Sequence, residues 1–373
     1  MMKFTIEKNI IVENLANVVK AISAKNIIPI LNGIKFELED DGLYLTASDS
    51  ELTIRSFIPN ESINKVDSTG SIIIQSKFIL DILRKLPSDL VNFELMDGLK
   101  IRISSDNSQY DLNCLDPKEY PSLKLEEKDK PIIIKGELFK GIIGQTSFAI
   151  STQELRPLLT GLNFKIVGDV FECIATDSYR LAKKVVSLDM PSEEDINIVI
   201  PGKNIIELDK IIVDDEPVEM HVFSNKILFK YKNYIFQSNL LSGTYPNTTN
   251  LIPTDFSIII NTKLSDYFSA IDRAALLTQG KDKNIVKMKV KDNQMVINSY
   301  ASEIGKVEEK LDIETSNDAN IDISFSAKYM LDALKTMKDD DILILLNGEV
   351  KPIVIKSVTD ESLIQLILPI KTY

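Results

Sequence analysis

Tryptophan is absent from the sequence, and histidine occurs once, at His221. A histidine-based catalytic triad, a paired-histidine zinc site and a haem site would each depend on that one imidazole. His221 stands in the alternating run VEMHVF, which predicts a position on the surface of a strand. Neither glycine-rich phosphate-binding motif, Gly-x-x-x-x-Gly-Lys-Ser/Thr or Gly-x-Gly-x-x-Gly, occurs. The composition therefore argues against an enzyme, and we predict no catalytic residue, no bound metal and no cofactor.

Cysteine, glycine and proline are also scarce. Cys114 and Cys173 fit no metal-ligand spacing and stand among apolar residues, so both are predicted to be buried free thiols. With 14 Gly and 14 Pro in 373 residues, collagen-like, low-complexity and wholly disordered chains are excluded. The most apolar segments, such as Leu363–Ile370 with Gln365 inside it, are far shorter than the roughly 20 residues of a membrane span, and the N-terminal segment lacks a signal-peptide core. We expect a cytoplasmic protein without membrane contact.

One sequence pattern occurs three times along the chain. It consists of a β-rich tripeptide, a small residue, a lysine and an amphipathic helix, at 71–87, 197–212 and 321–337. Its lysines, Lys77, Lys203 and Lys328, are 126 and 125 residues apart. A second helical pattern precedes each copy in the same order, so three similar units account for the whole chain.

The three units are predicted to be separate domains. Their boundaries fall at polar, proline-marked segments, Glu126–Pro131 and Ile252–Asp255. We therefore expect a first domain at 1–126, a central domain at 130–253 and a third domain at 255–373.

Within each unit the hydrophobic period changes from helical to alternating, which predicts helices followed by strands. Asp41-Gly42 is typical of a hairpin turn between two such strands. Helical spacing predicts two buried helix faces in the first unit, one formed by Ile11, Leu15, Val18, Val19 and Ile22, the other by Phe78, Ile79, Ile82, Leu83 and Leu86. The predicted fold class is α+β, with two helices packed on antiparallel sheet in each domain.

Charge is distributed unevenly along the chain, whose net charge is −12. The six predicted helical windows contain 15 Lys/Arg and 8 Asp/Glu, which gives the helices a net charge of +7 and the rest of the chain −19. If the helices share one face, that face attracts phosphate while the remaining surface repels it. The other interpretation is that lysine is simply a good helix former. Because no base-reading motif or aromatic platform is present, any DNA contact is predicted to be independent of sequence.

Three further motifs carry a family resemblance: ATDSYRLA (175–182), SGTYPNTTNLIP (242–253) and LILPIKTY (366–373). With the triple repeat, they make the whole chain similar to the bacterial sliding clamps, the beta subunits of DNA polymerase III. The resemblance implies a head-to-tail homodimeric ring of six clamp domains, with helices lining the hole and sheets outside. Such a ring encircles double-stranded DNA and confers processivity on the replicative DNA polymerase. It performs no chemistry and is opened by an ATP-driven clamp loader.

The resemblance also implies three sets of site residues. The duplex-contacting positions of the family fall on Lys25, Lys77, Gln153, Pro157, Leu158 and Lys203. Some members carry tyrosines where this chain has Pro157 and Leu158. Neither Pro157 nor Leu158 can donate a side-chain hydrogen bond to phosphate, whereas Lys25, Lys77 and Lys203 agree with the charge pattern.

The second implied set forms an apolar pocket for linear peptide motifs of the polymerase catalytic subunit, the clamp loader, other polymerases and mismatch-repair proteins. Tyr179 stands where histidine is common in the family, and Asn250 where arginine occurs. The matching positions are Leu159, Thr176, Ser178, Tyr179, Arg180, Leu181, Pro246, Asn250, Leu251, Leu366, Ile367, Leu368, Pro369 and Ile370.

The third set is a dimer seam that joins an edge strand of the first domain to one of the third domain. Asn107 and Gln109 occupy positions that are basic in the family. The matching positions are Tyr110, Leu112, Leu276 and Leu277, with Glu303, Glu308 and Glu309 as an acidic rim.

Two other functions remain open on the sequence. An enzyme would need a carboxylate cluster for Mg²⁺, for which the runs Asp214–Glu216 and Asp339–Asp341 are candidates. The second alternative is a ring-shaped scaffold that binds partner proteins without encircling DNA.

Overall fold

The computed structural model describes residues 2–23, 26, 28–278, 284–316 and 319–371. In this part of the chain, six α-helices and a set of antiparallel strands follow one another in an order that repeats three times. Each repeat consists of a strand, a helix, three strands, one or two further strands, a second helix and three final strands. The α+β prediction, with two helices packed on antiparallel sheet in each of three repeats, is confirmed.

The elements of the three repeats have the following bounds. The first repeat contains β1 (Lys3–Glu7), α1 (Lys8–Val18), β2 (Gly33–Leu38), β3 (Gly42–Ser48), β4 (Leu52–Pro59), β5 (Lys65–Ser68), β6 (Gly70–Gln75), α2 (Ser76–Lys85), β7 (Leu90–Met96), β8 (Lys100–Ser105) and β9 (Ser108–Leu115). The second contains β10 (Ile132–Lys135), α3 (Gly136–Thr146), β11 (Gly161–Val167), β12 (Val170–Thr176), β13 (Arg180–Ser187), β14 (Ile196–Pro201), α4 (Gly202–Asp209), β15 (Pro217–Val222), β16 (Lys226–Tyr231) and β17 (Tyr234–Asn239). The third contains β18 (Ile258–Lys263), α5 (Leu264–Ala275), β19 (Ile285–Lys291), β20 (Gln294–Ala301), β21 (Gly305–Asp312), β22 (Glu314–Thr315), β23 (Ile321–Ser326), α6 (Ala327–Leu334), β24 (Asp341–Leu346), β25 (Ile353–Ser357) and β26 (Leu363–Ile367).

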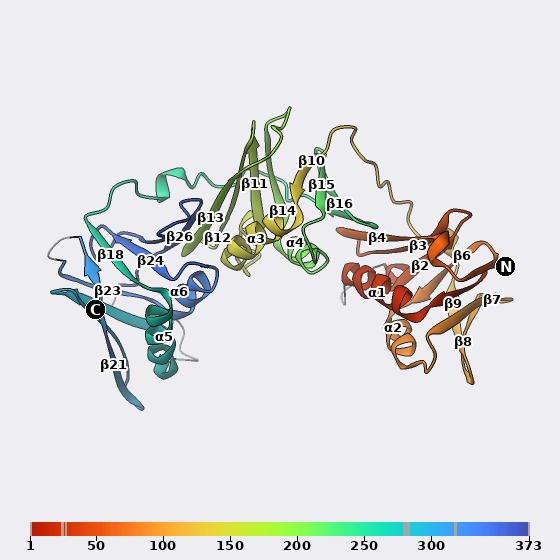
Figure 1. Cartoon of the computed structure of the whole chain (residues 1–373), viewed down its shortest axis with the longest axis horizontal. Coiled ribbons are helices and arrows are strands. Elements are labelled where there is room, and N and C mark those ends of the chain that lie inside the picture. Colours follow the sequence, from red (N-terminus) through yellow and green to blue (C-terminus); the bar gives the residue numbers. More distant parts are fainter. Residues whose placement is uncertain (1, 24–25, 27, 279–283, 317–318, 372–373) are drawn as a thin grey trace. The chain divides into compact units, whose positions relative to one another are not determined.

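The chain divides into two compact units. The first unit, residues 1–137 and 207–240, holds the first repeat together with β10 and β15–β17 of the second. Its strands follow the order β10-β15-β16-β17-β4-β3-β2-β6-β9-β8-β7-β1-β5. In the middle of this order β17 pairs antiparallel with β4, with Tyr234 opposite Ser56. Helices α1 and α2 lie side by side (Figure 1).

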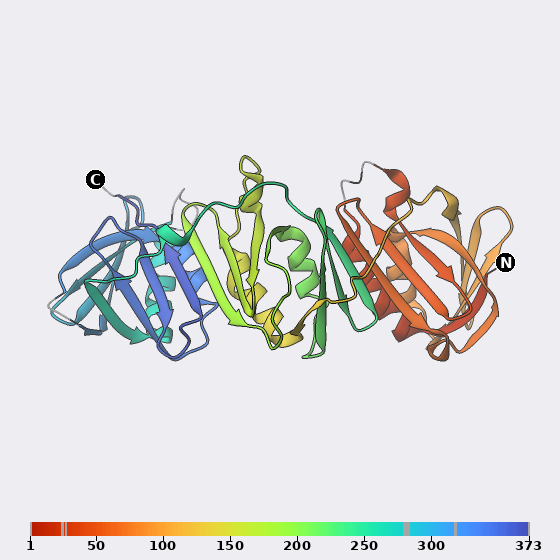
Figure 2. The same cartoon turned by 90° about the horizontal axis from the view of Figure 1, so that it is seen from above.

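The second unit, residues 138–206 and 241–373, holds β11–β14 of the second repeat and the third repeat. It contains a sheet of order β14-β11-β12-β13-β26-β25-β24-β18-β22 and another of order β21-β20-β19-β23. Here β13 pairs antiparallel with β26, with Arg180 opposite Ile367. The blue strands β24, β25 and β26 lie next to one another in Figure 2, as their pairing requires. Thus each unit contains one joint between strands of different repeats.

The apolar stripes of the helices face the cores, with one exception. In α1 the buried residues include Ile11, Leu15 and Val18, in agreement with the helical spacing. In α2 only Ile79 and Leu83 are buried, whereas the side chain of Phe78 is 55% exposed. The prediction that Phe78 belongs to the buried face is wrong, because the core-facing stripe of α2 passes through the residue after it.

The hairpin predicted at Asp41-Gly42 joins β2 to β3 and is confirmed. Gly42 has φ +155°, and a Cβ atom at this position would lie 2.2 Å from the carbonyl oxygen of Ile58. The close approach of β4 therefore requires glycine here.

The observed helix ends change the charge distribution predicted from the sequence. The six α-helices, together with the 3-10 turn at Val19–Ala21 that follows α1, contain nine Lys/Arg and eight Asp/Glu. The helices themselves are therefore almost neutral, and the predicted value of +7 is wrong for them. Most of the excess lysines lie outside the helices: Lys135, Lys210, Lys263 and Lys335 are next to a helix end, and Lys338 follows the end of α6 by four residues.

Candidate peptide pocket and DNA interface

The second unit contains an apolar cluster that brings together several predicted pocket residues. Leu159, Leu181 and Leu366 are buried there beside Tyr245. We call this set the apolar cluster; its buried members are Leu159, Ile174, Leu181, Val199, Tyr245, Leu345, Val354 and Leu366. Leu158, a predicted DNA contact, packs against the same cluster, near Gly243. Pairing of β13 with β26 places Leu181 directly opposite Leu366 and so creates the floor of this site.

The loop between β12 and β13 is fixed by its own side chains. The Asp177 carboxylate accepts hydrogen bonds from the backbone N–H groups of Tyr179 (2.9 Å) and Arg180 (3.0 Å). The Thr176 hydroxyl donates to the Arg180 carbonyl at 2.6 Å, and Ser178 adopts φ +77°. These bonds form a tight turn that directs the Tyr179 ring outward, leaving it 59% exposed.

Arg180 connects this loop to α6. Its Nε donates to Asp177 at 3.1 Å and its Nη1 to Asp332 at 2.8 Å, while its guanidinium lies 4.4 Å from the centre of the Tyr329 ring. The side chain is nearly buried, so two carboxylates and an aromatic face together compensate its desolvation. Arg180 therefore holds the pocket loop and the third repeat in a fixed relation.

A cavity of about 820 Å³ lies beside Tyr179 and the C-terminal segment. The backbone N–H of Leu368 donates to the Tyr179 carbonyl at 2.8 Å, and that of Ile370 to Ser324 at 2.7 Å, which fixes the segment that follows β26. We call this hollow the tail cavity; its lining residues are Gln153, Tyr179, Asn284, Ser326, Lys328, Tyr329, Leu368, Pro369, Ile370 and Lys371.

The remaining predicted pocket residues differ in their placement. Pro246, Asn250 and Leu251 are exposed, between Tyr245 and Ile252, which both contact the apolar cluster. Ile367 faces the other way, into the core of the third repeat. Tyr245 and Tyr329 were missed on the sequence. Tyr245 lies inside the motif SGTYPNTTNLIP and its hydroxyl accepts the Thr176 N–H at 3.1 Å, so the motif itself could have indicated it.

Two of the predicted DNA-contacting lysines, Lys77 and Lys203, occupy one structural position. Each is the second residue of the second helix of its repeat, Lys328 has the equivalent position in the third repeat, and all three are exposed. Gln153 and Pro157 are exposed near the start of the 3-10 turn at Pro157–Thr160. Lys25 lies outside the described residues.

The predicted seam residues lie on β9, in the 3-10 turn after α5, and on or just before β21. Tyr110 and Leu112 are on β9, with the Tyr110 side chain exposed. Leu276 is 60% exposed in the 3-10 turn after α5, and Leu277 is half-buried. Glu303 and Glu308 are exposed, whereas Glu309 on β21 forms a two-point ion pair with Arg273 in its own chain, at 3.0 and 2.7 Å.

Carboxylates of both acidic runs that an enzyme would need form ion pairs or hydrogen bonds with residues outside these runs. Asp214 is bonded to Lys232 and Tyr231, which lower the pKa of its carboxyl to about 2. Asp341 pairs with Lys263 at 2.8 Å, and the Asp339 carboxylate accepts a hydrogen bond from Thr359. Among the described residues, neither run gathers with other carboxylates in a group able to hold a metal.

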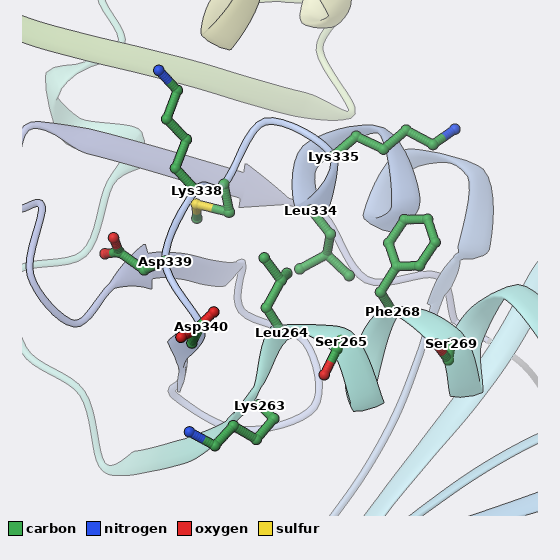
Figure 3. A pocket seen from close by; sticks show the side chains of 11 residues that line it. Lys263, Leu264, Ser265, Phe268, Ser269, Leu334, Lys335, Lys338, Asp339 and Asp340 are labelled. Atoms are coloured by element: carbon green, nitrogen blue, oxygen red, sulfur yellow. The ribbon is translucent and has the colours of Figure 1, made fainter.

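Asp339 and Asp340 border a second hollow, of about 670 Å³, between the start of α5 and the end of α6 (Figure 3). Its apolar side chains Leu264 and Leu334 lie next to each other, while the lysines at its edge point outward. None of the predicted site residues lines it.

The two cysteines and the single histidine are all buried. Both cysteines are buried free thiols, as predicted. His221, in contrast, is only 1% exposed, so its predicted position on a strand surface is wrong: the segment before β10 covers it, and the backbone N–H of Lys128 donates to its Nδ1. None of the described helices is long and apolar enough to span a membrane.

Three repeated domains, each with two helices on antiparallel sheet, define the class of clamp proteins, and the comparisons with known proteins agree. Family models of the DNA polymerase III beta subunit match the N-terminal domain at residues 2–124, the central domain at 133–247 and the C-terminal domain at 249–371. The chain belongs to the DNA polymerase III beta subunit family. Its class of function is that of a sliding clamp, a processivity subunit without catalytic activity.

Relatives and solved structures cover the whole chain. The beta sliding clamp of Bacillus subtilis is 43% identical over the full length of both chains, and that of Staphylococcus aureus 39%. The crystal structure of the DNA polymerase sliding clamp from Bacillus subtilis matches with a TM-score of 0.96 at 42% identity. The beta chain of DNA polymerase III from Streptococcus pneumoniae matches with a TM-score of 0.96 at 34% identity, again over both chains.

Proposed function

We propose that two copies of this chain close head to tail into a ring around duplex DNA, and that this ring tethers the replicative DNA polymerase. One observation supports the ring. Each of the three repeats contains a pair of strands of the kind that joins neighbouring repeats, but in the described part of a single chain only two such joints are formed, β17 with β4 and β26 with β13.

The two internal joints follow the same rule. β4, β13 and β21 are equivalent, because each is the third strand after the first helix of its repeat, and β9, β17 and β26 are the last strands. β17 pairs with β4, and β26 pairs with β13, both antiparallel. Among the described residues β21 pairs only with β20, and residues 108–113 of β9 pair only with β8. The rule predicts that β9 of one chain pairs with β21 of a second copy, and two copies satisfy this joint twice.

The character of these edges supports the proposal. β9 and β21 have eight residues each. β21 lies at the edge of its sheet, and β9, although it stands between β6 and β8 in the strand order, has a free edge along residues 108–113. The other strands at sheet edges in the described structure have two to six residues. A long exposed edge invites pairing with another chain. Leu276, Leu277, Tyr110 and Leu112 supply apolar surface beside the edges, and Glu303 and Glu308 supply a charged rim.

The proposed DNA contacts rest on the position of the lysines. A cation in the first turn of a helix is disfavoured by the helix dipole, by about 0.3–1 kcal/mol. The second position of α2, α4 and α6 nevertheless carries a lysine in every repeat. Helix stability does not explain this choice, whereas contact with phosphate does. We assign Lys25, Lys77, Gln153, Pro157 and Lys203 to the duplex, add Lys328 by equivalence, and place Leu158 in the apolar cluster instead.

The proposed partner site combines the apolar cluster with the tail cavity. Its buried floor, with Leu181 and Leu366, and its exposed rim, with Tyr179 and Leu368, suit leucine and aromatic side chains of a linear peptide. We assign to it the peptides of the polymerase catalytic subunit, the clamp loader, other polymerases and mismatch-repair proteins.

We further propose three domains, at 1–126, 130–253 and 255–373, and a cytoplasmic location for the protein. The segments 126–131 and 252–255 contain neither helix nor strand, which supports these boundaries.

The test is retention on DNA of different topology. The chain is loaded by a bacterial clamp loader and ATP onto nicked circular DNA, then separated by gel filtration at about 0.15 M salt, where the Debye length is ~8 Å. A closed ring stays on the circle and leaves after a single cut that linearises it, and the free protein has about twice the chain mass of 41.9 kDa. Equal retention on circles and linear fragments contradicts encirclement. Partner binding without any DNA retention identifies the chain as a protein scaffold.

A further inference from the structure

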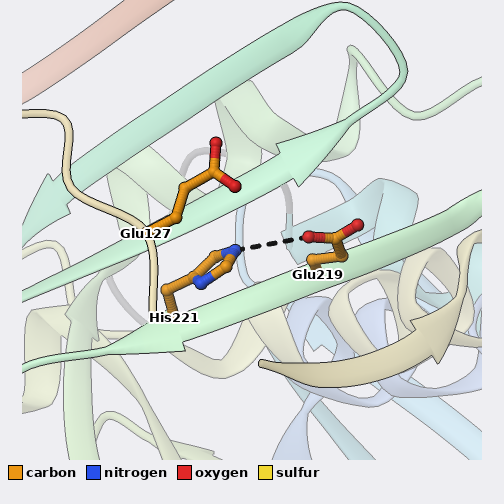
Figure 4. Close-up of side chains that lie close together, drawn as sticks. All are labelled: Glu127, Glu219 and His221. Atoms are coloured by element: carbon orange, nitrogen blue, oxygen red, sulfur yellow. Dashed lines mark ion pairs between the residues drawn. The ribbon is translucent and has the colours of Figure 1, made fainter. Parts of the chain in front are cut away.

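The buried imidazole of His221 faces two carboxylates that come from different parts of the first unit (Figure 4). Glu219 lies two residues before His221 on β15, and Glu127 lies on the segment that precedes β10. One ligand atom from each residue lies within 4.8 Å of the other two. His221 Nε2 makes no hydrogen bond of good geometry in the described structure, although the side chain is almost completely buried; its one recorded contact is with Glu219 Oε2 at 3.4 Å, dashed in Figure 4. A buried polar atom that lacks a hydrogen bond is costly, and a cation shared with the carboxylates would satisfy it.

The three side chains offer one imidazole nitrogen and two carboxylate oxygens, a combination of ligands that suits Zn²⁺. Imidazole nitrogen and carboxylate oxygen both bind Zn²⁺, at about 2.0–2.2 Å, which separates neighbouring donors of a tetrahedral site by about 3.4 Å. Nε2 lies 3.4 Å from Oε2 of Glu219. Mg²⁺ prefers oxygen donors and water, so a buried imidazole selects against it. In contrast to the prediction of no bound metal from the sequence, we propose that Glu127, Glu219 and His221 form a site for one divalent cation such as Zn²⁺, with water as the fourth ligand.

Binding of the cation requires the imidazole to change its tautomer. The backbone N–H of Lys128 donates to Nδ1 at 2.8 Å, so the neutral ring carries its proton on Nε2. A metal needs the Nε2 lone pair, and the proton must then move to Nδ1. Nδ1–H and the Lys128 N–H are both donors and repel each other, so the hydrogen bond to Lys128 breaks when the metal binds.

This exchange changes how the segment at residues 124–128 is held. Without the cation, Lys230 pairs with Glu127 at 2.9 Å and Lys226 donates to the Lys124 carbonyl at 2.8 Å, in addition to the Lys128 bond. With the cation, Glu127 and the two β15 residues share a metal, so a metal bridge replaces the amide–imidazole bond. The proposed site thus ties the segment between the first two repeats to β15, independently of the clamp function.

The single histidine allows a direct experiment. The full chain, without an affinity tag, is labelled with ¹⁵N-histidine, so that only one imidazole is observed. Before Zn²⁺ is added, the ring is expected as the Nε2–H tautomer. One equivalent of Zn²⁺ should convert it to the Nδ1–H tautomer and accelerate hydrogen exchange of the Lys128 amide. An imidazole spectrum that Zn²⁺ leaves unchanged overturns the proposal.

Variants separate this site from other surface carboxylates. Glu219→Gln and Glu127→Gln are each expected to weaken Zn²⁺ binding at least tenfold in calorimetry, since even groups outside the coordination sphere contribute about 10–100-fold. Glu126→Gln is the matched control, because Glu126 is exposed and directly precedes Glu127. It should leave the affinity for Zn²⁺ unchanged. His221→Asn retains an acceptor for the Lys128 N–H but should abolish binding. Equal affinity in the wild type, Glu219→Gln and Glu127→Gln overturns the site, as does an equal tautomer shift with Mg²⁺.

Discussion

Arg180 is the residue on which the geometry of the peptide pocket most depends. It is the only side chain of the described pocket loop that bonds both Asp177 and Asp332, and it also stacks on Tyr329. Removing one partner of a buried ion pair leaves the other charge without compensation, which typically costs about 3–5 kcal/mol. The loop that presents Tyr179 therefore depends on a single guanidinium.

We predict that Arg180→Gln lowers the free energy of unfolding by about 3 kcal/mol, because two carboxylates lose their cation. It should also weaken partner-peptide binding, since the Tyr179 loop is no longer held to α6. Urea denaturation and peptide titration by fluorescence anisotropy measure the two effects.

The matched control is Arg156→Gln. Arg156 is exposed and makes one hydrogen bond in this region, to the Ser178 hydroxyl at 3.1 Å. Loss of such a surface contact should change stability by less than about 0.5 kcal/mol. If both variants lose the same stability, the buried ion pairs of Arg180 are not the cause.

The two thiols should be unreactive in the folded protein. Burial raises the pKa of Cys114 to about 11 and that of Cys173 to about 12. At pH 8 only about one Cys114 in a thousand and one Cys173 in ten thousand are thiolate, the reactive form. We predict that an aromatic disulfide reagent labels no thiol of the native chain within minutes and both in urea. Rapid labelling at pH 8 without denaturant would contradict this placement.

Residue burial could be predicted from the sequence only where local pattern decides it. Both cysteines stand in apolar surroundings that are also their surroundings in the fold. His221 stands in an alternating strand, but its exposure is decided by Lys128 and its neighbours, 93 positions earlier in the chain. The predicted pocket residues likewise separate into buried floor and exposed rim, a distinction that strand pairing makes and spacing does not.

At the scale of elements, the 3-10 turn after α5 and the edge strand β21 form the proposed seam. Leu276 is 60% exposed there, in contact with solvent in the single chain. If a second copy covers this surface, a charge placed on it is buried without a partner, which costs about 3 kcal/mol or more.

We predict that Leu276→Lys combined with Leu277→Lys weakens the dimer at least about a hundredfold, because 1.4 kcal/mol corresponds to a tenfold change. Sedimentation velocity over a range of concentrations measures the shift toward monomer. Val350→Lys is the control, since Val350 is 63% exposed on another part of the third repeat. A dimer that tolerates the leucine variant as well as the control would place the seam elsewhere.

The elements differ in how far the sequence determines them. Helices and hairpins follow from periodicity and turn residues, as α1 and the Asp41-Gly42 turn show. Helix ends do not, because flanking lysines continue the helical pattern beyond the last hydrogen-bonded turn, as Lys210 does after α4. Pairing between strands of different repeats, such as β17 with β4, depends on edges that meet only in the folded chain.

At the scale of the whole molecule, we expect the positive charge of the helix ends and the closing of the ring to contribute differently to DNA binding. The chain carries −12, and its helices are almost neutral within their observed bounds, so long-range attraction to DNA is weak. A ring does not need strong attraction once it is closed, because topology retains it. The lysines at the second position of α2, α4 and α6 are then expected to act in loading and orientation rather than in retention.

This division of tasks can be tested by replacing Lys77, Lys203 and Lys328 with glutamine. Each lysine that contacts a phosphate contributes about 0.9 to the slope of log affinity against log salt. Six lysines in two chains therefore change the slope by up to about 5, and loading at about 0.15 M salt should become slower. Residence on a nicked circle after loading should remain that of the wild type, because leaving requires the ring to open. The control replaces one exposed strand lysine per repeat, Lys100, Lys165 and Lys291, with the same change in charge. If the helix variant leaves the circle faster than this control, charge and not closure retains the protein on DNA.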